Sequence, residues 1–405
     1  MAGEWREISL ATVAVISSGK RPGRVLKVAE DGCQIPVIGG GGISGFTDSA
    51  LFEKGVLITG RVGTLGKLFA TSGPCWPSDN ALVIQPSSEG TDPKFLRYAL
   101  QNVISEAAGM NRGAANPLIT QGDLGRLMIG YPALSDQRAI AHILGTLDDK
   151  IELNRKQNET LEAMARALFK AWFVDFEPVR AKMEGSWKRG QSLPGLPAHL
   201  YDLFPDRLVE SEFGEIPEGW EMRSLDSIAN YLNGLALQKF PPESETEFLP
   251  VIKIAQLRAG NTNGADKAST QIKPEYVVVD GDVLFSWSGS LEVEVWNGGR
   301  GALNQHLFKV TSNEVPKWFY FFATRQHLSD FRAIAAGKAT TMGHIQRKHL
   351  TDARIAVAPP ESIAESIIKC NTPDLPCTRP CRRPMGTRYQ HLSAEERATI
   401  MIMLQ

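Results

Sequence analysis

The sequence predicts an α+β protein in which two similar α+β modules are joined by one long helix of the coiled-coil type. Three observations predict it: a large internal repeat, short apolar runs of strand length within each copy, and a segment between the copies with unbroken helical spacing. With 405 residues, 42% apolar and 22% charged, the chain has a globular composition and enough length for two or three domains.

The internal repeat is visible in the order of the sequence signals. The first copy opens with EWREISL at residues 4–10 and the second with GWEMRSL at residues 219–225. Short runs bounded by Gly, Pro, Asn and Asp then predict strands, with one or two helices between them. The matched segments are, in order, 36–38 with 250–252, 56–58 with 283–285, 94–100 with 317–323, and the closing runs that end at Pro132 and Pro360.

The segment between the copies, residues 136–175, is predicted to be a single helix. It contains no proline and one glycine, Gly145. Apolar or special residues recur alternately every four and three positions, which is the spacing of a coiled-coil seam. A core helix packed along one module is the alternative. The seam consists of Ile140, Leu144, Leu147, Ile151, Asn154, Asn158, Leu161, Ala165, Leu168 and Trp172.

Composition excludes several classes of protein. The longest apolar runs fall far short of the roughly 20 residues that a membrane-spanning helix needs, and the N-terminus lacks the pattern of a secretory signal. We therefore expect a cytoplasmic protein. The odd number of cysteines argues against a disulfide framework, and the spacing of Cys370, Cys377 and Cys381 does not match zinc knuckles. A net charge of −1 leaves room only for local basic clusters.

No catalytic or nucleotide-binding motif is present in the sequence. The seven histidines show none of the spacings of metal or catalytic motifs, and the glycine-rich segments 39–42 and 60–67 lack the GxxxxGK[ST] pattern of a phosphate-binding loop. These segments fit tight turns. The alternative is that Arg61 and Lys67 project from the second turn toward nucleic acid, where arginine can pair with guanine or hold a phosphate.

A second basic cluster is expected in the second copy. Between Arg325 and Arg354 six basic residues stand against two aspartates, and the small polar residues of the loop 337–343 would let the backbone approach a phosphate. The counterpart in the first copy is the stretch 112–116. Together with Arg61 and Lys67, the candidate DNA contacts are Arg112, Asn116, Lys338, Thr340, Thr341, Arg347 and Lys348.

The chain resembles the specificity subunits of Type I restriction-modification systems over about residues 1–368. The residues that carry the resemblance are the helix entry at 132–162, the segment ALFKAWFVDFEPVRAKMEG at 167–185, and the duplicated openings. The resemblance implies two target recognition domains, each reading half of a split sequence in double-stranded DNA. It also implies that modification and restriction subunits are the partners. S-adenosylmethionine, ATP and magnesium then belong to those partners, and this chain has no cofactor and no catalysis of its own.

The resemblance also assigns domains and an interface. The expected parts are target recognition domains at 1–135 and 206–360, a central helix and connector at 136–205, a stub of a distal helix at 361–370, and an aberrant tail at 371–405. For Trp172 and Phe173, packing at the end of the seam is the alternative to an interface role. The expected subunit interface is Ile140, Leu144, Leu147, Ile151, Asn154, Asn158, Leu161, Leu168, Trp172 and Phe173.

One departure from the family concerns the C-terminal part. Family members end with a second long helix, whereas here the helix begun at ESIAESIIK meets a proline-rich stretch after Cys370, and YQHLSAEERATIMIMLQ resembles the start of an insertion-sequence transposase. We expect a C-terminally truncated chain whose uncovered seam promotes self-association. The alternatives are a non-functional product that binds DNA weakly without assembling, or a stand-alone DNA methyltransferase. The DNA sequence recognised is not predicted.

Overall fold

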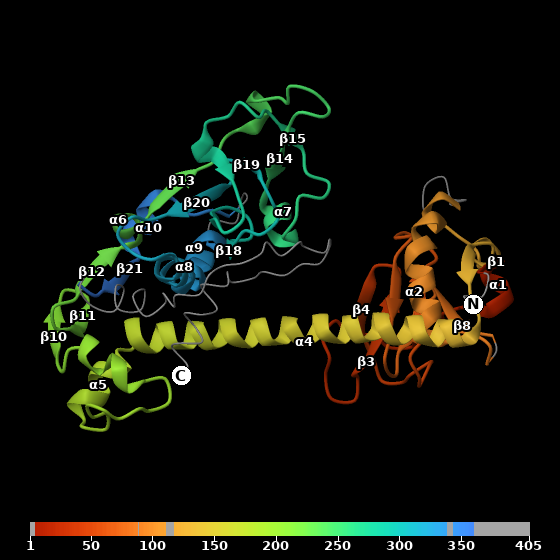
Figure 1. Cartoon of the computed structure of the whole chain (residues 1–405), viewed down its shortest axis with the longest axis horizontal. Helices are drawn as coiled ribbons and strands as arrows, with labels where there is room; N and C mark the ends of the chain where they lie inside the picture. Colours follow the sequence, from red (N-terminus) through yellow and green to blue (C-terminus); the bar gives the residue numbers. More distant parts are fainter. Residues whose placement is uncertain (1–4, 88, 111–116, 338–342, 360–405) are drawn as a thin grey trace. The chain divides into compact units, whose positions relative to one another are not determined.

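The computed structural model describes residues 5–87, 89–110, 117–337 and 343–359 (Figure 1). The chain forms two compact units, residues 1–153 and 154–405, and the long helix α4 (Leu134–Phe173) begins in the first unit and ends in the second. Both units contain sheets as well as helices, and α4 is 40 residues long. These features confirm the predicted α+β fold class. The domain boundaries remain predictions, and the segments 361–370 and 371–405 lie outside the described residues.

The described residues of the first unit form three sheets. One has the strand order β2-β8-β5-β6 with antiparallel pairs throughout, a second has the order β4-β3-β7 with β3 and β7 parallel, and β1 pairs with β9. The elements are β1 (Arg6–Ser9), α1 (Leu10–Val13), β2 (Ala14–Ser18), β3 (Ile35–Gly39), β4 (Gly42–Thr47), β5 (Leu57–Gly60), β6 (Leu68–Ala70), β7 (Trp76–Pro77), β8 (Ala81–Pro86), α2 (Pro93–Val103), the 3-10 helix η1 (Ile104–Met110), α3 (Gln121–Gly125) and β9 (Met128–Tyr131).

The core of the first unit forms where α2 packs near β8. The helix begins at Pro93 because the Asp92 carboxylate accepts the free N–H groups of Lys94 and Phe95, each at 2.9 Å. Its apolar face is buried in one cluster with residues of β8 and the chain after α3. Strands β5 and β8 are buried along most of their length, which explains why they appear in the sequence as unbroken apolar runs.

The second unit repeats this plan with additions. Its sheets have the orders β13-β20-β17-β18, β15-β14-β19-β16, β12-β21 and β10-β11. The elements are α5 (Glu177–Met183), η2 (Ala198–Leu203), β10 (Leu208–Ser211), β11 (Gly214–Pro217), β12 (Glu221–Ser224), α6 (Leu225–Ile228), β13 (Asn230–Asn233), η3 (Leu237–Lys239), β14 (Leu249–Ile252), α7 (Ile254–Ala259), β15 (Lys267–Ala268), η4 (Pro274–Tyr276), β16 (Val277–Val278), β17 (Val283–Ser286), β18 (Val293–Val295), β19 (Gly301–Leu303), β20 (Leu307–Thr311), α8 (Lys317–Gln326), α9 (Leu328–Ala336), α10 (Arg347–Asp352) and β21 (Arg354–Val357).

The strand pairing supports the predicted repeat and corrects it at one place. The sheet β2-β8-β5-β6 corresponds strand by strand to β13-β20-β17-β18, and the pair β1-β9 corresponds to β12-β21. Strand β5 begins at Leu57 and β17 begins at Val283, so Leu57 matches Val283. The sequence comparison, which matched Val56 with Val283, was wrong by one residue because two consecutive apolar runs can be aligned equally well with either offset.

A glycine holds the same close approach in both units. The N–H of Gly19 donates to the carbonyl of Ala81 at 3.1 Å, and the N–H of Gly234 donates to that of Leu307 at 3.0 Å. A Cβ atom on Gly19 would lie 2.1 Å from the carbonyl oxygen of Ser78, and one on Gly234 would lie 2.2 Å from that of Asn304. Both glycines are therefore required by space, since the opposing atom belongs to the backbone.

The long helix α4 is tied to each unit by polar contacts. In the first unit the fully buried Gln137 accepts the N–H of Asp92 at 3.0 Å and donates to the carbonyl of Pro132 at 3.0 Å. Further along, Asp148 accepts the Tyr98 hydroxyl at 2.8 Å; burial, with this bond, raises the pKa of Tyr98. In the second unit Glu162 pairs with Arg325 of α8. Among the described helices none is long and apolar enough to cross a membrane.

The close approach at Gly19 gives a stability prediction. We expect Gly19→Ala to lower the free energy of unfolding of the first unit by about 1–3 kcal/mol, because the added methyl group must displace backbone. Gly23→Ala is the matched control, since a Cβ atom there meets nothing within 4 Å. Urea unfolding of both variants measures the difference. Equal midpoints for the two variants would contradict this account.

Candidate nucleic-acid interface

In each unit a turn after a buried strand forms backbone hydrogen bonds with a distant segment, 117–119 in the first unit and 343–345 in the second. In the first unit the N–H of Gly63 donates to the carbonyl of Pro117 at 2.9 Å, and the N–H of Ile119 donates to that of Arg61 at 3.0 Å. We call this arrangement the loop frame. It holds the residues that follow the segment 111–116, which lies outside the described residues.

The second unit has the same loop frame. The N–H of Gly289 donates to the carbonyl of Gly343 at 2.9 Å, and the N–H of Ile345 donates to that of Trp287 at 3.0 Å. These residues follow the segment 338–342, again outside the described residues. The two frames therefore occupy corresponding places in the two units.

Two further contacts fix the correspondence residue by residue. The N–H of Arg61 donates to the carbonyl of Asn80 at 2.8 Å, and the N–H of Trp287 donates to that of His306 at 3.3 Å. An antiparallel bridge follows in each unit, and it joins Val62 to Leu118 and Ser288 to His344. The counterpart pairs around the frame are Ser18 and Asn233, Arg61 and Trp287, Val62 and Ser288, Asn80 and His306, Leu118 and His344, and Gln121 and Arg347.

The predicted DNA contacts that the structure describes lie on or next to these frames. Arg61 is part of the first frame and is half-buried, and Lys67 is exposed at the end of the same turn between β5 and β6. Arg347 and Lys348 are exposed in the first turn of α10, two and three residues after Ile345. The other candidates lie outside the described residues and remain predictions: Arg112, Asn116, Lys338, Thr340 and Thr341.

The guanidinium of Arg347 is held in place from two sides. One of its N–H groups donates to the carbonyl of Tyr231 at 3.0 Å, and the group lies 5.6 Å from the centre of the Phe308 ring. Its counterpart Gln121 contacts the corresponding strand of the first unit, where its amide donates to the Ser18 hydroxyl at 3.0 Å. A guanidinium has five donors, so the bond to Tyr231 leaves others for an anionic partner.

Three further basic residues of the run between Arg325 and Arg354 have side-chain contacts within the second unit. Arg325 is paired with Glu162, Arg332 donates to the carbonyl of Leu291 at 2.9 and 3.1 Å, and the guanidinium of Arg354 lies 4.6 Å from the centre of the Phe213 ring. For these three arginines the charge run does not indicate a DNA contact. A run of like charge in the sequence cannot reveal partners that come from distant segments.

A polar and aromatic cluster beside the second frame was missed by sequence reasoning. The indole N–H of Trp287 donates to the side-chain oxygen of Asn233 at 2.9 Å and to the carbonyl of Gln305 at 3.1 Å. The Trp287 ring lies 5.7 Å from the ring of His306, whose Nδ1 is 3.0 Å from the Ser288 hydroxyl. The one-residue offset in the sequence comparison hid it, because only the register of the strands makes Trp287 the counterpart of the candidate Arg61.

The predicted interface residues on α4 fall into two groups. Leu147, Ile151 and Asn154 are exposed, whereas Ile140, Leu144, Asn158, Leu161 and Leu168 are half-buried. Trp172 and Phe173 are only 1% and 2% exposed, within an aromatic cluster that includes Phe169, Phe204 and Trp220. Their assignment to a subunit surface is therefore corrected, since the structure uses both side chains for packing within the second unit.

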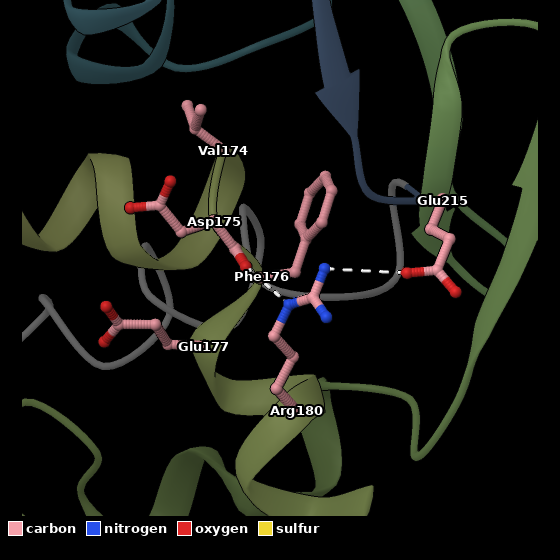
Figure 2. Close-up of a pocket in the computed structure, with 6 residues that line it drawn as sticks. All are labelled: Val174, Asp175, Phe176, Glu177, Arg180 and Glu215. Atoms are coloured by element: carbon pink, nitrogen blue, oxygen red, sulfur yellow. Dashed lines mark hydrogen bonds and ion pairs between the residues drawn. The ribbon is translucent and has the colours of Figure 1, made fainter.

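A surface pocket of about 530 Å³ lies where α4 ends and α5 begins (Figure 2). The chain turns there at Phe176, which adopts a left-handed conformation with φ of 56°. Arg180 donates from Nε to the carbonyl of Asp175 at 3.1 Å and lies 3.7 Å from Glu215, while Lys170 pairs with the Asp175 carboxylate at 2.5 Å. These charges largely neutralise one another, so we assign the pocket to the turn between the helices. Across the described ranges, no three His, Cys, Asp or Glu side chains gather as a metal site would require.

Comparison with known proteins identifies the family. Residues 2–163 and 217–369 both match the family model described as the Type I restriction modification DNA specificity domain. The HindI specificity subunit of Haemophilus influenzae is 33% identical over 221 residues, which cover 44% of this chain and 47% of that protein. The MjaIX specificity subunit of Methanocaldococcus jannaschii is 27% identical over 212 residues, which cover 52% and 44%.

This chain therefore aligns with about half the length of these two relatives. A solved specificity subunit from M. genitalium is 13% identical, with 88% of this chain and 85% of that chain covered and a TM-score of 0.41. Each matched segment contains one of the two loop frames. The protein belongs to the family of Type I restriction-modification DNA specificity proteins.

Proposed function

We propose that this chain is the DNA-sequence specificity subunit of a Type I restriction-modification complex. Each unit reads one half of a bipartite site in double-stranded DNA. The observation that carries the proposal is that both family matches contain the same loop frame, with different side chains displayed around it. The relatives are named as specificity subunits, which supports a non-catalytic role. Methyl transfer and cleavage, with S-adenosylmethionine, ATP and magnesium, belong to the partner subunits.

The charge distribution is consistent with a reader that uses a few local cations. Bases are read by hydrogen bonds in the grooves, whereas phosphate contacts position the protein and make its affinity depend on salt. The net charge of −1 provides no general attraction to DNA. The phosphate contacts therefore fall to cations near the loop frames, of which Arg61, Lys67, Arg347 and Lys348 are in the described residues.

Helix α4 carries the second part of the proposal, which is docking of modification subunits. Ile143 is 60% exposed and Leu147 is 52% exposed, and the two lie one helical turn apart on the same face. Ile151, which is 38% exposed, lies one further helical turn along the same face. Contiguous exposed apolar side chains on a helix are typical of a protein interaction surface.

The DNA part of the proposal predicts a change in salt dependence. We expect Arg61→Gln and Lys348→Gln each to reduce the magnitude of the slope of log affinity against log salt by about 1, because each change removes one phosphate-neutralising charge. Lys188→Gln is the matched control, since Lys188 is exposed in the connector after α5. Fluorescence anisotropy with labelled duplex DNA gives the slopes. Slopes equal to that of the wild type in both variants would exclude these two residues from the DNA contact.

The proposed docking surface on α4 predicts which substitutions weaken the binding of modification subunits. We expect the double change Ile143→Asp and Leu147→Asp to weaken binding of modification subunits at least tenfold, because each buried apolar side chain contributes roughly 1.5–3 kcal/mol. DNA binding by the isolated chain should not change. Gln157→Asp is the control, because Gln157 is exposed and polar on the same helix. Sedimentation of mixtures of the subunits measures assembly, and a double variant that assembles as tightly as the control would disprove this surface.

A further inference from the structure

We propose that the second unit reads an adenine edge of its half-site with the side-chain amide of Asn233, and that Trp287 is the positioning residue that holds this amide in place. The inference rests on the proposed function and deepens it by naming the residues that determine base preference in one half-site. It follows from the comparison of the two loop frames, from the contacts of Asn233, and from those of Trp287.

The comparison of the two units shows where the chain varies its chemistry. Core positions keep their character across the duplication, as in Leu10 with Leu225 and Ile119 with Ile345. At the six counterpart pairs around the loop frame the residue type differs: Ser18 corresponds to Asn233, Arg61 to Trp287, and Leu118 to His344. One backbone thus displays two different sets of side chains beside its loop. This is what the recognition of two unlike half-sites requires.

Asn233 has the geometry of a reading group. It is exposed at the end of β13, and its side-chain oxygen accepts the indole N–H of Trp287 at 2.9 Å. This bond fixes the plane of the amide, and it leaves the second lone pair of the oxygen able to accept a hydrogen bond from a base. The side-chain N–H₂ of Asn233 makes no hydrogen bond with any residue that the structure describes. An amide that offers a donor and an acceptor side by side matches N7 and the N6 amino group of adenine in the major groove.

Trp287 acts through Asn233 because its indole N–H already donates to protein acceptors and is not available to a base. The indole N–H is shared between the side-chain oxygen of Asn233 and the carbonyl of Gln305. The centre of the indole ring lies 5.7 Å from the centre of the His306 ring and 6.0 Å from that of the Phe308 ring. The Ser288 hydroxyl, 3.0 Å from Nδ1 of His306, fixes the imidazole in turn. A side chain held in this way loses little conformational freedom when it binds, which favours discrimination between bases.

The first unit lacks this arrangement. At the position of Asn233 it has Ser18, whose hydroxyl accepts from the amide of Gln121 at 3.0 Å, and Arg61 stands at the position of Trp287. No indole is available there to hold an amide. The half-site that the first unit reads therefore serves as an internal control for changes made at Asn233 and Trp287.

The test is a selection of binding sites from a random duplex DNA library by the purified full chain, followed by sequencing. The wild type should enrich a bipartite motif with an adenine at one position of one half. Asn233→Ala should reduce the preference for that adenine by about tenfold and leave the other half unchanged. Trp287→Phe keeps a ring but removes the indole N–H, so it should weaken the same adenine preference and leave the base preference of the other half unchanged.

Asn263→Ala is the matched control, because Asn263 is an exposed asparagine of the same unit outside the loop frame. Its motif should equal that of the wild type. An adenine preference that survives Asn233→Ala, or equal changes in both halves, would overturn the inference and leave the proposed function standing. A wild-type chain that enriches no sequence at all would overturn the proposed function and this inference with it.

Discussion

The pairing of backbone groups at the loop frame is the constraint on which the rest of this structure depends. Backbone N–H and C=O groups are strong hydrogen-bonding groups, and here the turn after β5 or β17 pairs with the segment 117–119 or 343–345 at 2.9 to 3.0 Å. Because these bonds involve only the backbone, they do not depend on the side chains at Arg61 or Trp287. The frame can therefore stay constant while the displayed residues change. Gly19 and Gly234 bring the neighbouring segments close enough for this arrangement.

Helix α4 is packed against the units near its two ends and carries exposed apolar side chains between them. Near its N-terminus Gln137 is locked to the first unit, and near its C-terminus Phe169, Trp172 and Phe173 are buried in the core of the second. Between these ends Ile143 and Leu147 are exposed. The ends of the helix therefore contribute to the stability of the units, whereas the side chains of Ile143 and Leu147 remain largely exposed.

Much of the fold could be predicted from the sequence, because it depends on local periodicity. The repeat, the run of helix without proline and the strand lengths all leave such signals. What could not be predicted depends on contacts between distant segments. The pairing of Arg325 with Glu162 and the burial of Trp172 are examples, because periodicity shows that a face is apolar but not what covers it. The offset of one residue between Val56 and Leu57 hid Trp287, since both alignments place apolar residues opposite each other.

The proposed function requires that one backbone frame support two different reading surfaces, and amide hydrogen exchange tests this requirement most directly. The N–H groups of Gly63 and Ile119 in the first unit, and of Gly289 and Ile345 in the second, are hydrogen-bonded in the structure. In the full chain, followed by nuclear magnetic resonance, all four should exchange much more slowly than unstructured amides, with similar protection at counterpart positions. Exchange at the rate of an unstructured chain at either pair would show that the two units do not share this frame.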